Sequence, residues 1–304
     1  MSIDPLLALA GLLVGFVVGL TGMGGGALTT PLLVLVFGVQ PLAAVSSDLV
    51  AAVVTKPVGG AVHLRRGTVN RQLVGLLALG SIPAAFSGAL ILDAAGGGGH
   101  TAAMVEAALG VALLAGALGI GARALTARLR PVPPPEASLR ISRARAVLTV
   151  AIGVIGGLVV GLTSVGSGSI MIVLLMLLYP RLTTAQLVGT DLVQAVPLVG
   201  AAAFGHLLFG DVRLGLTVSL LIGSIPGVYI GARLSSRANL PLIRPILALV
   251  LFLSGAKLLG VGNVALALLT GAAIALALFA WAVWHHPRVR RSPAGQPQPE
   301  PATL

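Results

Sequence analysis

Residues 17–26 read VVGLTGMGGG, and residues 159–168 read VVGLTSVGSG. Each stretch begins as an apolar segment and ends in glycine and hydroxyl residues that interrupt it. Four short apolar runs flank the two breaks, at 6–20, 27–38, 146–162 and 168–179. Irregular backbone at membrane depth is tolerated only where protein or a water-filled cavity satisfies its polar groups. The two stretches therefore predict a pair of broken membrane helices at related positions.

The composition of the chain is that of a membrane protein. Of 304 residues, 57% are hydrophobic and 9% are charged, whereas an ordinary soluble domain has roughly 25% charged residues. Most of the remaining apolar runs approach the roughly 20 residues that a helix needs to cross a hydrocarbon core. These runs are 42–62, 72–92, 102–122, 186–209, 214–232, 242–260 and 264–284. We expect an all-α, multi-pass protein of the cell membrane.

The two breaks belong to an internal repeat. Residues 47–50, Ser-Asp-Leu-Val, return at 190–193 as Thr-Asp-Leu-Val, and Gly-Ser-Ile-Pro at 80–83 returns at 223–226. His63-Leu64 returns as His206-Leu207, and the offset changes only from 142 to 143 along the repeat. Small apolar residues align by chance, but matched Asp, His and Pro residues indicate duplication.

The arginines predict the orientation of the two halves, because Lys and Arg are retained on the cytoplasmic side. Arginines cluster between the halves (123–145), near residues 65–71, at 233–244 and in the tail at 288–291. All four segments can lie inside only if each broken segment leaves and returns to the same side. Each repeat is then a re-entrant-type hairpin of two short helices plus three spans. That odd number of crossings inverts the second repeat relative to the first.

The chain is thereby predicted to have five parts. They are a first membrane repeat (1–126), a cytoplasmic Arg- and Pro-rich linker (127–143), a second membrane repeat (144–260), one extra transmembrane helix (261–286) and a disordered cytoplasmic tail (287–304).

Inverted repeats with interrupted helices are typical of secondary transporters, whose binding site lies where the repeats meet. The half-helices that start near Ala27 and Ser169 present unpaired N–H groups and positive dipole ends. Glycine lets an anion approach this backbone closely, so we expect a small anion as the substrate. The predicted binding residues are Thr21, Gly24, Gly25, Gly26, Thr163, Ser164, Gly166, Ser167, Gly168, Ser169, Lys56 and Gln194.

Three charged side chains within predicted spans need an explanation. An intramembrane carboxylate costs roughly 2.5–3.5 kcal/mol on insertion scales and is a functional candidate by default. Asp48 and Asp191 either couple transport to a proton or cation, or orient the hydroxyls of the site; alternatively, they cap half-helices and only stabilise the fold. Lys56 either holds the anion, extends to the lipid headgroups or pairs with Asp48. Gln194 either donates to the anion or bonds to a neighbouring helix.

The sequence also resembles a known family. The glycine-rich break followed by Pro31, the Asp48 and Asp191 segments, the stretch His-Leu-Arg-Arg-Gly at 63–67 and the two Gly-Ser-Ile-Pro segments look like the sulfite exporter TauE/SafE family. The resemblance covers about residues 6–260. It implies transport of sulfite or an organosulfonate, in the direction of export. The family often carries Asn where this chain has Asp48 and Asp191, a difference that bears on the coupling ion and on the substrate.

Other classes of function fit the sequence less well. The chain has no Cys, no catalytic Ser/His/Asp set in plausible register and no zinc-binding helix motif, so we expect no enzyme activity, metal or cofactor. It also lacks the G-x-x-x-x-G-K-[ST] phosphate-binding loop. The net charge of +11 is explained by loops that face anionic lipid, with no nucleic acid as a partner. A non-transporting membrane scaffold and a transporter of another solute are the alternatives, and the oligomeric state is left open.

Overall fold

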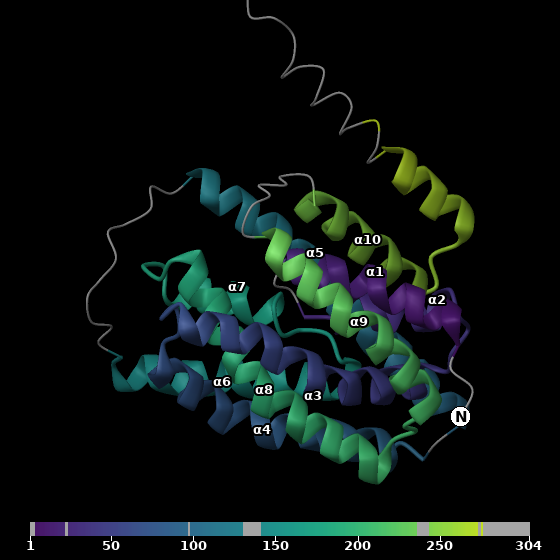
Figure 1. The fold of residues 1–304 in the computed structure, drawn as a ribbon, viewed down its shortest axis with the longest axis horizontal. Coiled ribbons are helices and arrows are strands. Elements are labelled where there is room, and N and C mark those ends of the chain that lie inside the picture. Colours follow the sequence, from purple (N-terminus) through teal and green to yellow (C-terminus); the bar gives the residue numbers. More distant parts are fainter. Residues whose placement is uncertain are drawn as a thin grey trace, which may run out of the picture. The chain divides into compact units, whose positions relative to one another are not determined.

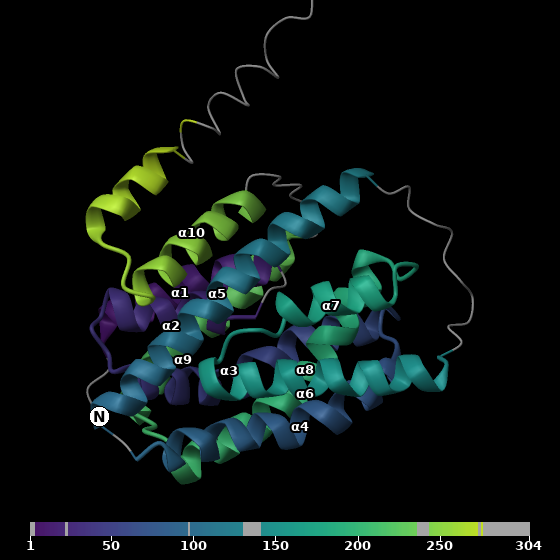
Figure 2. The same cartoon turned by 180° about the vertical axis from the view of Figure 1, so that it is seen from behind.

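The computed structural model describes residues 4–21, 24–96, 98–129, 141–235, 243–272 and 275. Within these ranges the chain is helical, apart from turns and one isolated bridge between Gly166 and Gly168 (Figures 1 and 2). The all-α prediction is therefore confirmed. The chain divides into a unit of Met1–Val261, which contains both predicted repeats, and a unit of Gly262–Leu304.

Ten helices of the first unit are described. In the first half they are α1 (Pro5–Thr21), α2 (Gly26–Leu35), α3 (Pro41–Arg65), α4 (Arg71–Ala94) and α5 (Gly98–Leu129). In the second half they are α6 (Arg143–Thr163), α7 (Ile170–Leu178), α8 (Thr184–Phe209), α9 (Leu214–Ser235) and α10 (Ile243–Leu258). The two glycine-rich breaks lie between α1 and α2 and between α6 and α7, as the sequence predicts.

Six of the described helices are long and apolar enough to cross a membrane: α3, α4, α5, α6, α8 and α9. Helix α6 is longer than the short run expected from hydropathy, with 21 residues, because Ser142 caps its start by accepting a hydrogen bond from Arg145 N at 3.3 Å. The second unit contains a helix at Asn263–Ala272. Half of the predicted extra span, the tail 287–304 and linker residues 130–140 lie outside the described residues.

In each half, the helix after the break turns back along the helix before it. Leu7, at the start of α1, and Leu33, near the end of α2, share one buried cluster with Ala44 and Leu220. In the second half, Tyr179 at the end of α7 and Thr149 near the start of α6 form a hydrogen bond of 2.7 Å between their hydroxyls. The outer ends of the two helices in each pair thus lie close together, and we call the glycine-rich breaks the tips of these pairs.

Helices from opposite halves pack in pairs through glycines. A Cβ atom at Gly11 would lie 2.7 Å from Leu220 O, and one at Gly15 would lie 2.6 Å from Ser224 O. Residues further along α1 thus contact residues further along α9, so the two helices run in the same direction. They lie side by side (Figure 1). Helices α4 and α6 pack in the same way, through Gly153, Gly157 and Gly161. Small residues allow this close approach between helices in lipid, where van der Waals packing drives association.

Two other pairs of helices run in opposite directions. Ser46 near the start of α3 bonds to His206 near the end of α8, whereas Gly60 near the end of α3 packs against Leu192 and Val193. Helix α5 is antiparallel to α10 as well, because Gly110 contacts Leu259 and Gly116 contacts Leu251. Helices α3 and α8 thus occupy corresponding places in the two halves with opposite directions.

Corresponding hydroxyls join the halves on either side of this α3–α8 pair. Ser47 Oγ accepts a hydrogen bond of 3.1 Å from Arg213 N, at the start of α9. Thr190 Oγ1 accepts one of 3.0 Å from Asn70 N, at the start of α4. Since each hydroxyl immediately precedes an Asp of the repeat, the contacts that hold the residues just before α4 and α9 also position Asp48 and Asp191.

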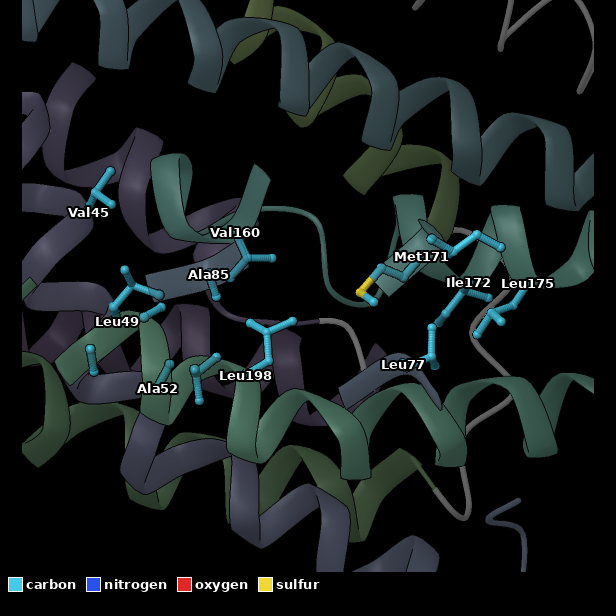
Figure 3. Close-up of a cluster of buried hydrophobic side chains, with 14 of the residues drawn as sticks. Val45, Leu49, Ala52, Leu77, Ala85, Val160, Met171, Ile172, Leu175 and Leu198 are labelled. Carbon is cyan, nitrogen blue, oxygen red and sulfur yellow. The ribbon is translucent and has the colours of Figure 1, made fainter. Parts of the chain in front are cut away.

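The largest buried cluster lies between α3, α4, α6, α7 and α8. Figure 3 shows side chains from both halves in it, among them Leu49, Leu77, Val160, Met171 and Leu198. This core holds the second hairpin firmly against α3 and α8, the helices that carry the two aspartates.

Candidate functional site

The two glycine-rich breaks meet in the interior of the first unit. A Cβ atom at Gly24 would lie 3.0 Å from Ser167 O and 3.4 Å from Lys56 Nζ. One at Gly26 would overlap the carbonyl oxygen of Ser164. Glycine at these two positions is therefore what lets the first tip contact the second.

The backbone of the second break adopts conformations that other residues rarely use. Gly166 has a φ of 133° and Gly168 a φ of 90°, values that favour glycine. Ser164, which ends α6, is the one non-glycine residue among the described positions with a positive φ, at 61°. Such a conformation costs of order 1 kcal/mol or more and is typical of functional sites.

Asp48 on α3 accepts hydrogen bonds from a hydroxyl group of the second break and from one on α2. Its Oδ2 atom accepts a hydrogen bond of 2.5 Å from Ser164 Oγ and one of 3.2 Å from Thr30 Oγ1 on α2. The side chain is buried, with an exposed fraction of 4%. Asp48 thus ties the first half-helix to the second break rather than capping a helix of its own.

Lys56 lies two turns further along α3 and is also buried, with an exposed fraction of 8%. Its Nζ atom donates a hydrogen bond to Ser167 Oγ of the second break. It interacts electrostatically with both Asp48 and Asp191. Lys56 therefore points to the meeting point of the tips, and does not extend toward the headgroups at the end of its helix.

The two remaining candidates on α8 differ in their surroundings. Asp191 is buried, with an exposed fraction of 1%, and its carboxyl group interacts electrostatically with the ammonium group of Lys56. Gln194 accepts a hydrogen bond of 3.2 Å from Ser81 Oγ on α4 and donates one of 3.1 Å to Met171 Sδ on α7. Its amide therefore bonds to side chains of two neighbouring helices.

Several predicted residues do not face the meeting point through their side chains. Thr21 Oγ1 bonds to Val17 O of its own helix. Thr163 Oγ1 bonds to Val159 O of its own helix and accepts a hydrogen bond of 3.1 Å from Val165 N, so it supports the backbone of the break. Ser169 Oγ is buried beside Gly116 on α5, where a Cβ would lie 3.3 Å away. Gly25, Gly166 and Gly168 contribute backbone only.

Sequence reasoning overlooked hydroxyls on α2 and α9. Thr29 and Thr30 lie beside Asp48, and Ser224 lines a small cavity with it. Two adjacent threonines before Pro31 in an apolar run are a signal that could have identified the first pair. Ser224 is part of the matched Gly-Ser-Ile-Pro segment, but its neighbours come from α1 and are visible only in the folded chain.

His206 has a structural role at the edge of the site. Its Nε2 atom lies 2.7 Å from the carbonyl oxygen of Gly161, which requires Nε2 to donate. Its Nδ1 atom then accepts the 2.8 Å hydrogen bond from Ser46 Oγ. This neutral tautomer joins α3, α6 and α8. No cluster of three metal-binding side chains occurs within the described part of the chain.

The arrangement is chemically suited to a small, partly dehydrated ion. One ammonium group and the hydroxyls of Ser164, Ser167 and Thr30 converge where two half-helices begin, and hydroxyls can turn to donate or accept. The two carboxylates limit how much negative charge the site accepts unless a proton or cation compensates it. Groups of this kind are suited to binding a small ion.

Comparison with known proteins shows the family of the chain. The family Sulfite exporter TauE/SafE matches residues 7–258. The chain is 43% identical to the probable membrane transporter protein YjnA of Bacillus subtilis (strain 168) over 255 residues, which cover 83% of this chain and 98% of that protein. It is 25% identical to the probable membrane transporter protein YdhB of the same organism over 232 residues, 76% of this chain and 90% of that protein.

No solved structure matches the chain significantly. The family match spans all ten helices of the first unit, including both breaks and the residues around Lys56. The family and both relatives are described as transporters rather than enzymes. This chain is a multi-pass membrane protein that belongs to the TauE/SafE family of sulfite exporters.

Proposed function

We propose that the chain is a secondary transporter of a small anion, sulfite or a related sulfur oxyanion or organosulfonate, and that it works as an exporter. The observation that carries the proposal is the meeting of both breaks at Lys56, where Gly24, Ser167 and the buried ammonium group are in contact. If an oxyanion replaced Ser167 Oγ as the partner of Lys56 Nζ, it would accept charge-assisted hydrogen bonds, which are shorter and stronger than neutral ones. The description of the family names sulfite and export.

Alternating access between inverted repeats is part of this proposal. Three observations support inversion. Helix α3 is antiparallel to α8, and α5 is antiparallel to α10. The hydrogen bond of Ser47 to the start of α9 has its counterpart in the hydrogen bond of Thr190 to the start of α4. Related halves of opposite orientation can exchange inward-open and outward-open shapes around one site. The re-entrant hairpins would then approach the membrane midplane from opposite faces.

Labelling of single cysteines tests the inversion, because the chain has no native Cys. We expect Arg66→Cys, between α3 and α4, to react with an impermeant maleimide only after the cytoplasmic face is opened. Val212→Cys, between α8 and α9, should react in intact cells, because an inverted repeat places this loop outside. Labelling of both positions from the same side would contradict inversion.

Counterflow of labelled sulfite in proteoliposomes tests the substrate class. We expect saturable exchange that thiosulfate and small sulfonates reduce, because the hydroxyl and backbone donors recognise oxyanion groups rather than one molecular shape. Sulfate measures how strongly the site selects among oxyanions. Absence of exchange with every tested anion, from protein that elutes as a single folded species, would favour a scaffold or a transporter of another solute.

A further inference from the structure

A small cavity lies beside Asp48, away from the Lys56 contact. It has a volume of about 30 Å³, enough for one water molecule or a small ion. Asp48, Thr29 and Thr55 line it, together with Ser224 on α9. Ser224 Oγ is buried and has no hydrogen-bond partner among the described residues. The cavity thus combines a buried carboxyl group with three hydroxyls, one of which lacks a partner.

At the corresponding position of the second half, described side chains occupy the place of this space. Ser81 corresponds to Ser224, and its Oγ donates to Gln194 Oε1 at 3.2 Å. Gln194 Nε2 in turn reaches Met171 Sδ at 3.1 Å. A Cβ at Gly156 would lie 2.5 Å from Met171 Cγ, so glycine there makes room for the methionine. The place beside Asp191 is filled by side chains that satisfy one another.

In the first half, Ala51 and Thr29 replace the two larger side chains of this filling set. Ala51 corresponds to Gln194, Thr29 to Met171 and Val14 to Gly156, and all three line the cavity. Ala51 cannot reach Ser224, and Thr29 presents an oxygen where Met171 presents sulfur. The first half therefore has oxygen atoms around a space, and the second half has a packed amide and thioether.

The charges around the site show what the space would hold. Among the described residues, Lys56 is the charged group that faces Asp48, and it also faces Asp191. An anion bound at Lys56 adds a third negative charge to one positive charge in the interior. Burying charge without compensation is costly, so binding of the anion favours a cation close to a carboxylate. The Asp48 cavity is the place with room and oxygen ligands for it.

We propose that the cavity formed by Asp48, Thr29, Thr55 and Ser224 binds one monovalent cation, a sodium ion or a proton carried on water, together with the substrate anion. Among the residues that the structure describes, this proposal assigns the site to Asp48 and not to Asp191. The cation offsets the charge of the anion, and the direction of net flux follows both gradients together. This inference rests on the proposed function for the identity of the anion, but binding of the cation can be measured without transport.

The first measurement is thermal unfolding of the purified full chain in detergent. Sodium chloride is compared with choline chloride at fixed pH, and a pH series in choline chloride tests the proton. We expect sodium, or else lower pH, to raise Tm by about 2–4 °C, since a ligand that binds only the folded state stabilises it. A Tm that rises with sodium at fixed pH identifies the bound cation as sodium. A Tm that responds to pH alone identifies it as a proton.

Three variants locate the site. Asp48→Asn should lose the response, and its amide oxygen can still accept from Thr30 and Ser164. Ala51→Gln should lose it too, because the glutamine fills the cavity and reaches Ser224, as Gln194 reaches Ser81. Asp191→Asn is the matched control and should retain the response. An equal loss in Asp191→Asn, a full response in Ala51→Gln, or no response of the wild type to either cation would overturn the proposal.

Sulfite counterflow in the same preparations separates the two proposals. Cation binding that depends on Asp48 without any anion exchange would leave the cation site standing and reject the anion substrate. Anion exchange whose cation dependence survives in Ala51→Gln would leave the transporter standing and reject the cavity as the cation site.

Discussion

Lys56→Met is expected to raise the half-saturating concentration of sulfite in counterflow by about tenfold to a hundredfold, because a hydrogen bond to a charged group contributes roughly 1.5–3 kcal/mol. Lys56 is the one ammonium group buried where the two breaks meet, and it bonds to Ser167 in the opposite half. Methionine has a similar length and packs in apolar surroundings, so the change removes the charge with little change in shape. The measurement is the concentration dependence of labelled sulfite exchange.

Lys56→Arg serves as the control for charge. It keeps a cation that can bind an oxyanion, so it should retain more of the affinity than Lys56→Met. The Tm of each variant shows whether the fold is intact, because Asp48 and Asp191 lose a compensating charge in Lys56→Met. Wild-type affinity in a folded Lys56→Met variant would show that this lysine only balances the two aspartates.

Gly26→Ala is expected to lower Tm by about 5 °C or more and to abolish most sulfite exchange, because overpacking in a well-packed interior typically costs 1–3 kcal/mol. The added Cβ would overlap the carbonyl oxygen of Ser164, and the next nearest atoms are also those of Ser164. Backbone cannot move aside as a flexible side chain does. The two tips must therefore separate, and the Ser164 bond to Asp48 is lost with them.

Gly25→Ala is the matched control for this change. Its Cβ would have Thr29 Oγ1 as its nearest neighbour, at 3.6 Å, which is an ordinary van der Waals distance. The two variants add the same methyl group to adjacent residues of the same break and differ only in what it meets. Equal stability and exchange in both would contradict the close contact between the tips.

Much of the architecture was predictable from the order of residues. Long apolar runs can be stable only in lipid, so the helices α3, α4, α8 and α9 followed from hydropathy alone. The breaks near Gly24 and Gly166 were visible because glycine and hydroxyl residues interrupt apolar runs at matched positions. Duplication placed Asp48 and Asp191 at corresponding points without any spatial information.

Helix boundaries and side-chain partners were harder to predict. The length of α6 depends on Ser142 as a cap, a local feature that hydropathy does not detect. Gln194 bonds to Ser81 and Met171, and Thr21 and Thr163 bond to their own helices. The sequence predicted all three as binding residues and left a bond to a neighbouring helix open for Gln194, because it identifies donors but cannot show which acceptor lies within reach.

The sequence by itself determined that this protein lies in a membrane, that it contains two related halves, and that each half has a break with a buried aspartate nearby. These properties depend on composition and on residues close together in the chain. Only the tertiary structure decided that the two breaks touch at Lys56, and that Asp48 has a cavity while the place beside Asp191 is filled. Both outcomes depend on how side chains from four or more helices pack against one another. These helices are far apart in the sequence, so only the folded chain shows whether their side chains fill the space.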